Sequence, residues 1–234
     1  MTGELVYGRR AVREALRGRR EVLELWATER AAGAEPWLAE AKPRQRPERE
    51  LSELAGTRDH QGVVARVEPF RYADAYELAA AEHPLIAALD RVTDPRNLGA
   101  VCRSALGAGA TGVVVPAHGS AVVTPAVARS SAGAVEHLPV AVVTNLARYL
   151  EEVKGPGLWV YGAAGEAASD LWSTDLTGGI ALVLGAEGKG LRPLVRRTCD
   201  ALVSIPLEGA VESLNVSVAA AVFLFEARRQ RRAG

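Results

Sequence analysis

Arg103 is the residue whose type and surroundings most strongly suggest chemistry. It lies in DRVTDPRNLGAVCRSALGAGATGVVVP (90–116), where a polar loop leads from a predicted strand into a helix opened by Asn97. The helix otherwise reads as largely buried, and an arginine in such a place normally needs an anion or a carboxylate partner. Asn97 has a simpler alternative role as a helix cap, which is the commoner use of Asn at such a position.

Two further polar segments follow predicted strands. In LVLGAEGKGL (182–191), Glu187 lies in a glycine-rich turn, where glycines permit positive φ and let a ligand approach the backbone. In IPLEGAVESLNVSVAAA (205–221), Ser213 and Asn215 precede the terminal helix, and a helix cap is the alternative role of Ser213. Sheets of parallel strands place ligands at the carboxyl ends of their strands, so the three segments predict one site.

Two glycine-rich stretches resemble nucleotide-binding motifs but lack the required context. GAGATG (107–112) follows a predicted helix and precedes a strand, the reverse of the dinucleotide fingerprint, and predicts a helix-to-strand turn. GAEGKG (185–190) has Val183 where a phosphate loop needs Gly, and Gly190 where it needs Ser or Thr.

Short apolar runs alternate with helical segments from Pro84 onward. Runs rich in Val, Leu and Ile in this arrangement predict a parallel sheet of the α/β class with helices on both faces. The predicted strands cover residues 85–90, 112–116, 138–143, 158–164, 180–185 and 201–206, and residues 214–232 form a long terminal helix.

The first 70 residues predict a small mixed domain. Residues 9–20 form a predicted helix, residues 21–28 and 62–70 two strands, and residues 33–50 a loop-like or weakly helical stretch, while 72–83 is a possible helical linker. The helix offers positive charge to RNA phosphates through Arg9, Arg10, Arg13, Arg17, Arg19 and Arg20.

The amino-acid composition excludes few classes of function. The 28 basic and 28 acidic residues of the 234-residue chain cancel, which neither favours nor excludes nucleic acid. Only three of the basic residues are lysines; the many arginines suit phosphate, but a GC-rich genome would also enrich them. Cys102 and Cys199 lack metal-type spacing, and no signal peptide or membrane span is evident. We therefore expect a soluble, reduced cytoplasmic protein without a metal.

The three polar segments together resemble the SpoU/TrmH family of SPOUT methyltransferases. The family pattern is an N-x-G-x-x-x-R helix, a G-x-E-G-x-G loop, and an I-P segment followed by S-L-N-V-S. Every signature position is filled, and the resemblance covers residues 84–234. YGRRAVREAL and HQGVVARVEPF (60–70) resemble the L30e-like RNA-binding domain of the subgroup that methylates 23S ribosomal RNA. The matching residues are Asn97, Gly99, Arg103, Gly185, Glu187, Gly188, Gly190, Ile205, Pro206 and Ser213 to Ser217.

This resemblance implies an L30e-like domain (1–70), a linker (71–83) and a trefoil-knotted methyltransferase domain (84–234) that forms a homodimer with each site built across the interface. It implies methyl transfer from S-adenosylmethionine to a ribose 2′-hydroxyl of RNA, most simply a guanosine of 23S ribosomal RNA. The cofactor would be held by Leu184, Gly185, Ile205, Pro206 and Leu214, and RNA by Arg9, Arg10, Arg13 and Arg17.

In this family Arg103 is the candidate for activating the hydroxyl. A guanidinium normally stays protonated, so we favour Arg103 as a phosphate anchor and stabiliser of the developing alkoxide. Asn97, Glu187, Ser213 and Asn215 would then orient Arg103 and the substrate, with Glu187 as the partner that fixes Arg103.

Two alternatives remain open at this point. A transfer-RNA or antibiotic-resistance ribose methylase would use the same scaffold, although the HQGVVARVEPF segment favours the ribosomal subgroup. A non-catalytic RNA-binding protein would be expected to lack Arg103, Glu187 or the S-L-N segment, and all are present.

Overall fold

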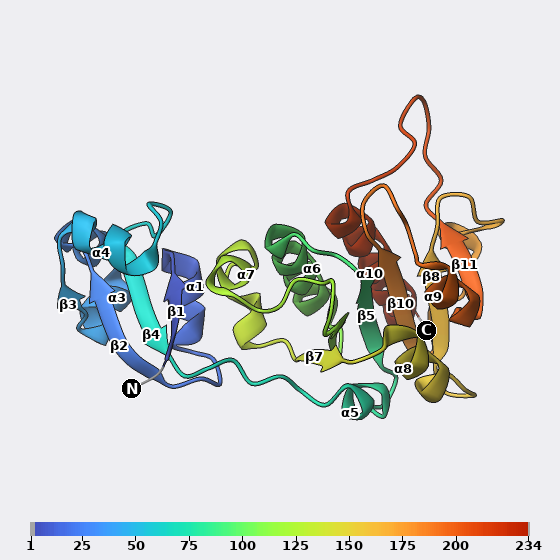
Figure 1. The fold of residues 1–234 in the computed structure, drawn as a ribbon, viewed down its shortest axis with the longest axis horizontal. Coiled ribbons are helices and arrows are strands. Elements are labelled where there is room, and N and C mark those ends of the chain that lie inside the picture. The colour runs from blue at the N-terminus through green and yellow to red at the C-terminus, as the bar shows by residue number, and fades with distance from the viewer. Residues whose placement is uncertain (1–2, 234) are drawn as a thin grey trace. The chain divides into compact units, whose positions relative to one another are not determined.

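Two sheets organise the chain, one in each of two compact units. The computed structural model describes residues 3–233. Unit 1 comprises the chain up to Arg71 together with Val123–His137, and unit 2 comprises Tyr72–Val122 and the chain from Leu138 onward. Residues 123–137 belong to the second predicted domain (84–234) but pack with the first unit. Figure 1 shows the elements of both units.

Unit 1 contains a four-stranded sheet in the order β1-β4-β2-β3. Strand β4 is antiparallel to β1 and β2, while the short β3 runs parallel to β2. The strands span β1 Glu4–Tyr7, β2 Val22–Ala27, β3 Arg44–Gln45 and β4 Val63–Val67, and the helices span α1 Arg9–Ala15, α2 Glu29–Ala34, α3 Pro36–Ala41 and α4 Glu48–Ala55.

The region predicted as a loop or weak helix, residues 33–50, is more ordered than its Pro, Glu and Arg content indicated. It holds α3, β3 and the start of α4. Pro36 occupies the first turn of α3, where its missing N–H costs no hydrogen bond. Leu38 of α3 and Leu51 of α4 are buried against the rest of the unit. This tertiary packing stabilises the two helices despite a composition that is typical of loops.

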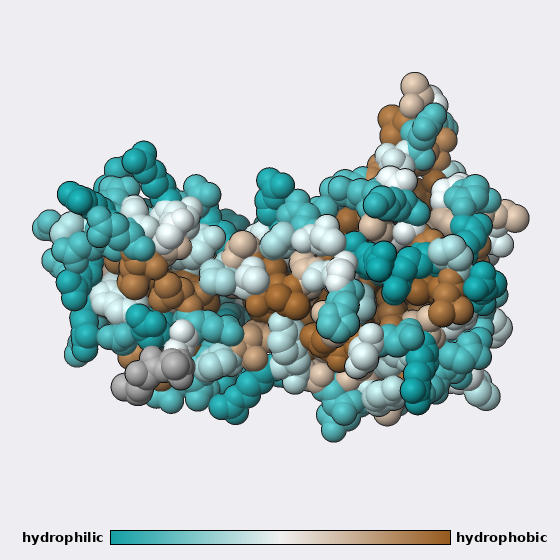
Figure 2. Space-filling model, viewed as in Figure 1, coloured by the Kyte–Doolittle hydropathy of each residue, from teal (hydrophilic) through white to brown (hydrophobic). Residues whose placement is uncertain are grey.

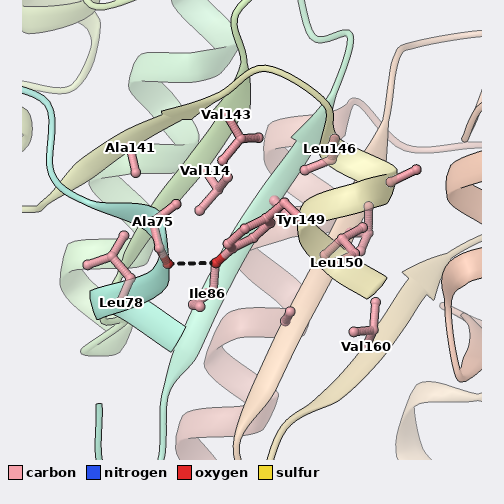
Figure 3. Packing of buried hydrophobic residues seen from close by; sticks show 14 of the residues in the cluster. Ala75, Leu78, Ile86, Val114, Ala141, Val143, Leu146, Tyr149, Leu150 and Val160 are labelled. Atoms are coloured by element: carbon pink, nitrogen blue, oxygen red, sulfur yellow. Dashed lines mark hydrogen bonds between the residues drawn. The ribbon is translucent and has the colours of Figure 1, made fainter. Parts of the chain in front are cut away.

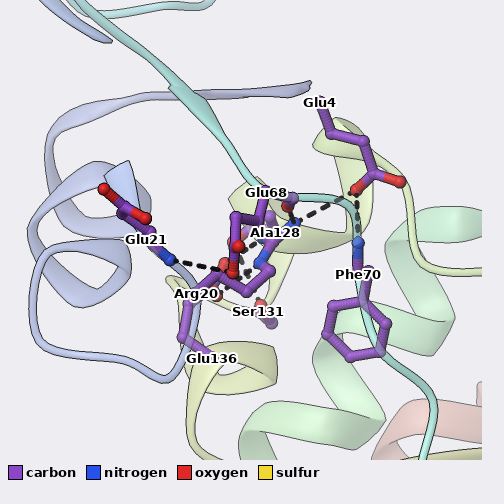
Figure 4. Close-up of polar contacts among 8 residues, drawn as sticks. All are labelled: Glu4, Arg20, Glu21, Glu68, Phe70, Ala128, Ser131 and Glu136. Carbon is purple, nitrogen blue, oxygen red and sulfur yellow. Dashed lines mark hydrogen bonds and ion pairs between the residues drawn. The ribbon is translucent and has the colours of Figure 1, made fainter. Parts of the chain in front are cut away.

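A buried ion pair ties residues 123–137 to the rest of unit 1. This segment contains α7 Pro125–Ser130 and the 3-10 helix η1 Ala134–Glu136. Figure 4 shows the Arg20 guanidinium between Glu136, Glu4 and Glu68. Arg20 Nε donates to Glu136 Oε2 at 2.9 Å, and both side chains are buried. The prediction that Arg20 binds RNA phosphate is therefore wrong, because its charge is already neutralised inside the unit.

Helix α1 is shorter than the predicted helix over residues 9–20, ending at Ala15. Gly18 lies in the turn that follows, where an added Cβ would come within 2.7 Å of Glu136 Cβ. The chain thus passes close to η1 before Arg20 reaches Glu136.

The sheet of unit 2 confirms the predicted parallel α/β architecture. Its seven strands run in the order β7-β6-β5-β10-β8-β11-β9, and every neighbouring pair is parallel. Six strands match predicted runs and the two-residue β9 was not predicted. They span β5 Leu85–Asp90, β6 Gly112–Pro116, β7 Val140–Val143, β8 Trp159–Ala163, β9 Ser169–Asp170, β10 Ile180–Gly185 and β11 Ala201–Ser204.

Helices cover this sheet because its strands are apolar throughout. On one face, Tyr149 and its neighbours pack against Ile86, Val114 and Val160 (Figure 3). The Tyr149 hydroxyl donates to the Ala75 carbonyl at 2.9 Å, which satisfies the polar end of a buried ring. The covering elements are α5 Ala75–Ala79, α8 Leu146–Val153 and α9 Pro193–Thr198, while α6 Pro95–Ala108 and α10 Val216–Ala233 pack on each other and contact β6 and β10.

Helix α6 begins at a different cap from the predicted one. The Asp94 side chain accepts a hydrogen bond from the Arg96 backbone N–H, so Asp94 and not Asn97 is the cap. Hydrogen bonds from Arg96 also lower the pKa of the Asp94 carboxyl, which favours its charged form at the helix N-terminus. At the other end Gly109 has φ of 75°, which confirms the predicted helix-to-strand turn.

Candidate active site at the carboxyl ends of the central strands

A cavity of about 630 Å³ opens in unit 2 where strands β5 and β10 end. The two strands are neighbours, with Asp90 paired in register with Gly185, so the loops that follow them meet at one edge of the sheet. These loops and the starts of α6, α9 and α10 line the cavity with Asp90, Arg91, Val92, Thr93, Asp94, Asn97, Gly119, Ala186, Glu187, Lys189, Gly190, Leu191, Arg192, Pro193 and Val216.

The Asp90 carboxylate fastens the two loops together. Asp90 is fully buried, and its Oδ1 accepts from Arg192 Nε at 2.7 Å while its Oδ2 accepts from the Arg192 backbone N–H at 2.8 Å. Neither residue was predicted from the sequence as part of the site. The sequence feature that could have identified them is the aspartate at the end of the apolar run LIAALD. A carboxylate at the end of a buried strand needs a hydrogen-bonding or charged partner, so Asp90 indicates a buried polar contact at this edge of the sheet.

Three of the predicted site residues form one hydrogen-bonded cluster, and two of them, Asn97 and Glu187, line this cavity. Asn97 Nδ2 donates to Glu187 Oε1 at 2.9 Å, and Asn215 Nδ2 donates to the same Oε1. Asn215 Nδ2 also lies 3.1 Å from Asn97 Oδ1. The cluster thus joins the first turn of α6, the loop after β10 and the residue before α10, one residue from each of the three motifs.

Ser213 is not part of this cluster. It is exposed, and within the described residues it makes no hydrogen bond. Asn215 caps α10 in its place, because its Oδ1 accepts from the Ser217 backbone N–H at 2.8 Å and from the Ser217 hydroxyl at 2.6 Å. The alternative interpretation of Ser213 as the helix cap is therefore wrong.

The expected pairing of Arg103 with Glu187 does not occur in the chain. Arg103 is exposed on α6 and has no hydrogen bond or ion pair with any residue of the range 3–233. Arg103 follows Asn97 by six residues, about one and two-thirds helical turns, so the two side chains leave α6 in different directions. The interpretation of Arg103 as a buried residue is corrected accordingly.

The glycine-rich turn after β10 is built from close backbone contacts. A Cβ on Gly185 would lie 2.2 Å from the Gly190 carbonyl carbon, so only glycine fits at this position. Gly190 N–H donates to the Ala186 carbonyl at 2.9 Å and closes the turn. Gly188 and Gly190 have positive φ and open space where a side chain would be, which leaves their backbone accessible to a ligand.

The five residues predicted to hold the cofactor lie at the ends of β10 and β11 and in the loop before α10. Leu184 is buried and Gly185 half-buried at the end of β10. Ile205 and Leu214 are half-buried, and Pro206 is exposed. Since β8 separates β10 from β11 in the sheet, all these ends lie along one edge, and open backbone beside apolar side chains fits a nucleoside ligand.

The loop between β11 and α10 extends away from the rest of unit 2 (Figure 1). Apolar residues lie on this loop in the space-filling view of Figure 2. Val211 is 56% exposed and Leu207 is 38% exposed, although both belong to a residue class that folding normally buries.

The arginines predicted to bind RNA differ in how freely their charge is available. Arg9 pairs with Glu35 at 3.1 Å, and Arg17 lies 3.5 Å from Glu14. Arg10 and Arg13 are exposed on α1 and have no ion pair within residues 3–233.

Other site types lack support in the described part of the chain. Residues 3–233 contain no group of three or more His, Cys, Asp or Glu side chains that could hold a metal ion. No helix there is long and apolar enough to cross a membrane. Burial raises the pKa of the Cys102 thiol to about 12, so this cysteine stays protonated and unreactive.

Two family models match separate parts of the chain. Residues 84–225 match the SpoU rRNA Methylase family, and residues 5–73 match the RNA 2′-O ribose methyltransferase substrate binding family. The first match contains all three residues of the Asn97–Glu187–Asn215 cluster.

Similar proteins support these matches along the full chain. The 23S rRNA (guanosine-2′-O-)-methyltransferase RlmB of Shewanella oneidensis is 42% identical over 98% of both chains. Its counterpart from Xanthomonas campestris pv. campestris is 52% identical over 77% of this chain and 75% of its own.

Solved structures also resemble the chain. The SpoU methyltransferase AviRb from Streptomyces viridochromogenes, in complex with the cofactor AdoMet, has a TM-score of 0.83 and 30% identity, covering 98% of this chain and 91% of its own. An AdoMet-bound rRNA methyltransferase from Sinorhizobium meliloti has a TM-score of 0.80 and 27% identity, covering 97% and 87%.

The turn geometry predicts that Gly185→Ala weakens binding of S-adenosylmethionine (AdoMet). The added Cβ must push the 186–190 turn outward, and overpacking of about 1–3 kcal/mol corresponds to a loss of affinity of about tenfold to a hundredfold. Isothermal titration calorimetry measures this loss. Gly178→Ala is the matched control, because its Cβ would meet nothing within 4 Å. Equal affinities for both variants would contradict the assignment of this turn.

Proposed function

Because the chain belongs to the SpoU rRNA methylase family, we propose that it transfers a methyl group from S-adenosylmethionine to the 2′-hydroxyl of a guanosine in 23S ribosomal RNA. The observation that carries this proposal is the convergence of Asn97, Glu187 and Asn215 in one hydrogen-bonded cluster beside the cavity. Each belongs to a different motif, and only folding brings them together. The reaction would take place in the cytoplasm, where ribosomal RNA is available.

The cofactor supplies an electrophilic methyl group on a sulfonium. We assign its binding to the backbone of the turn containing Gly185 and to apolar contacts from Ile205, Pro206 and Leu214, with Leu184 supporting the turn from the core. The protein's task is then to hold a ribose hydroxyl in line with the methyl group, which requires fixed positions more than reactive groups.

Arg103 has a role in this proposal that depends on a second copy of the chain. Its charge is exposed and unpaired in the described chain, and apolar residues lie on the same helical pair. Val218 and Phe225 lie seven residues apart on α10 and are 49% and 47% exposed, and Phe225 borders Gly107 of α6. We propose that this face forms a homodimer interface, across which Arg103 reaches the site of the partner subunit as a phosphate anchor.

Unit 1 is proposed to bind the RNA substrate. The arginines on and near α1 supply the charge, chiefly Arg10 and Arg13, which are exposed, with weaker contributions from the paired Arg9 and Arg17. A local basic surface is sufficient even in a chain with no net charge.

The proposed reaction predicts one new 2′-O-methyl mark on unmodified 23S ribosomal RNA. Purified protein and S-adenosylmethionine are incubated with full-length 23S transcript, and the mark is mapped by reverse transcription at low nucleotide concentration. We expect a single methylated guanosine, while 16S and transfer RNA serve as comparison substrates. Methylation of transfer RNA alone would contradict the ribosomal assignment and leave the reaction type intact.

The dimeric site predicts complementation between two inactive variants. Arg103→Ala should bind S-adenosylmethionine normally but lose methyl transfer, and Glu187→Gln should also lose it. A heterodimer of the two, purified with two different tags, retains one intact site if Arg103 acts across the interface, so about half the wild-type activity returns. An inactive heterodimer would place Arg103 and Glu187 in the same subunit's site.

The RNA-binding assignment predicts a change in salt dependence. Reversing the charge of both Arg10 and Arg13 to Glu should lower the slope of log affinity against log salt by about two, one for each lost phosphate contact. Filter binding with the 23S transcript measures the slope. Arg30→Glu with Arg58→Glu is the matched control, because both arginines are exposed and have no ion pair within residues 3–233. An unchanged slope in the α1 variant would show that this helix is merely solvated.

A further inference from the structure

An arginine of the 123–137 segment lies against the start of α1 in unit 1. Arg129 belongs to α7, which packs beside β1 and α1 (Figure 1). A Cβ added to Gly8 would lie 2.9 Å from Arg129 Nη1 and 3.1 Å from Arg129 Cδ, so the guanidinium rests against the Gly8 backbone. Gly8 also has φ of 95°, a conformation that favours glycine. Arg129 is thus placed beside the residue that immediately precedes Arg9 and Arg10.

The segment that carries Arg129 is held tightly against α1. Gly133 has φ of 85°, and a Cβ at this position would overlap Glu14 Cβ, so the segment and the helix approach closely. The buried pair between Arg20 and Glu136 fixes the end of the same segment. Because packing already restricts Arg129, its side chain would lose less conformational entropy on binding a ligand than a freely mobile arginine would.

The charge of Arg129 has no partner within residues 3–233. The side chain is half-buried but makes no hydrogen bond or ion pair there. Carboxylates of this region are bonded to other residues: Glu14 to Arg17 and His137, Glu35 to Arg9, and Glu136 to Arg20. A half-buried guanidinium with unused donors indicates a site for an anion, since such a group normally meets one or a carboxylate.

Arg129 adds to a group of unpaired positive charges in unit 1. Arg10 and Arg13 are three residues apart, so they share one exposed face of α1. Neither has an ion pair within residues 3–233. Like charges without counter-charges repel one another, and a polyanion that binds all of them relieves this repulsion. The face that we propose for dimerisation lies on α6 and α10 and contains none of these three arginines.

We propose that Arg129 binds a phosphate of the RNA substrate and extends the basic surface of unit 1, an inference that rests on the proposed RNA methylation. Its planar fork can donate two parallel hydrogen bonds to one phosphate, while Arg10 and Arg13 contact others. Arg129 lies outside residues 5–73, which match the substrate-binding family, and inside residues 84–225, which match the methylase family. The RNA-binding surface is therefore assembled from both parts of the sequence.

A salt titration of RNA binding tests this contact. The full chain is compared with its variants by filter binding to the 23S transcript at several salt concentrations. Arg129→Gln removes the charge, so the slope of log affinity against log salt should fall by about one. Arg129→Lys should keep the wild-type slope but bind more weakly, because it keeps the charge and loses the fork. Arg30→Gln, at an exposed arginine without an ion pair within residues 3–233, is the control and should match wild type.

Steady-state methylation separates RNA binding from a structural role. Arg129→Gln should raise KM for the 23S transcript by about threefold to tenfold, as expected for the loss of one charged contact. Its kcat should stay at the wild-type value, because the contact is the same in the ground state and the transition state. The melting temperature and the affinity for S-adenosylmethionine should also be unchanged.

The outcomes distinguish this inference from the proposed function. If wild-type protein shows no salt-dependent binding to 23S RNA, the proposed substrate is wrong. If the variant of Arg10 and Arg13 loses slope but Arg129→Gln keeps the wild-type slope and KM, Arg129 does not bind RNA. A slope that falls equally in Arg129→Lys and Arg129→Gln would overturn the inference too, because the charge would then not be what matters. A lowered melting temperature in both variants with an unchanged slope would show that Arg129 only packs against Gly8.

Discussion

The ion pair between Asp90 and Arg192 is the interaction on which the site depends. Asp90 ends the central strand β5, and Arg192 immediately precedes α9, so their contact fixes the loop after β10 against the loop that leads into α6. A fully buried carboxylate without its partner costs about 3–5 kcal/mol, so the two loops are held in one arrangement. Asn97 and Glu187 lie on these same two segments, at the start of α6 and in the loop after β10, so the contact between Asp90 and Arg192 also fixes the distance between them.

The sequence predicted those parts of the molecule that depend on local patterns. The buried strands of unit 2 were readable as apolar runs, and the motif residues Asn97, Glu187 and Asn215 do meet. Contacts between residues that are distant in the sequence could not be predicted from these local patterns. The direction of Arg103, the capping role of Asn215 in place of Ser213 and the burial of Arg20 each depend on residues distant in sequence. The trefoil knot remains a prediction from resemblance, since no periodicity encodes threading.

The site separates its tasks between backbone and side chains. The turn containing Gly185 offers main-chain atoms and small volume, which suits recognition of a cofactor that every family member shares. The side-chain cluster is polar and faces the cavity, where substrate groups must be oriented. The arginines that we propose to contact RNA lie in the other unit, on α1 and α7. With the tasks divided as proposed, a change of RNA target would require little change in the Asn97–Glu187–Asn215 cluster.

The packing of residues 123–137 with unit 1 has a consequence for how the two units are joined. The chain passes between them three times, near residues 71–72, 122–123 and 137–138. A protease cut within residues 72–83 would therefore leave the N-terminal piece bound through the buried Arg20–Glu136 pair. Residues 1–71 alone are therefore not the whole of unit 1, and fusing only these residues to another protein would leave part of the unit behind. A transplant would have to carry α7 and η1 with it.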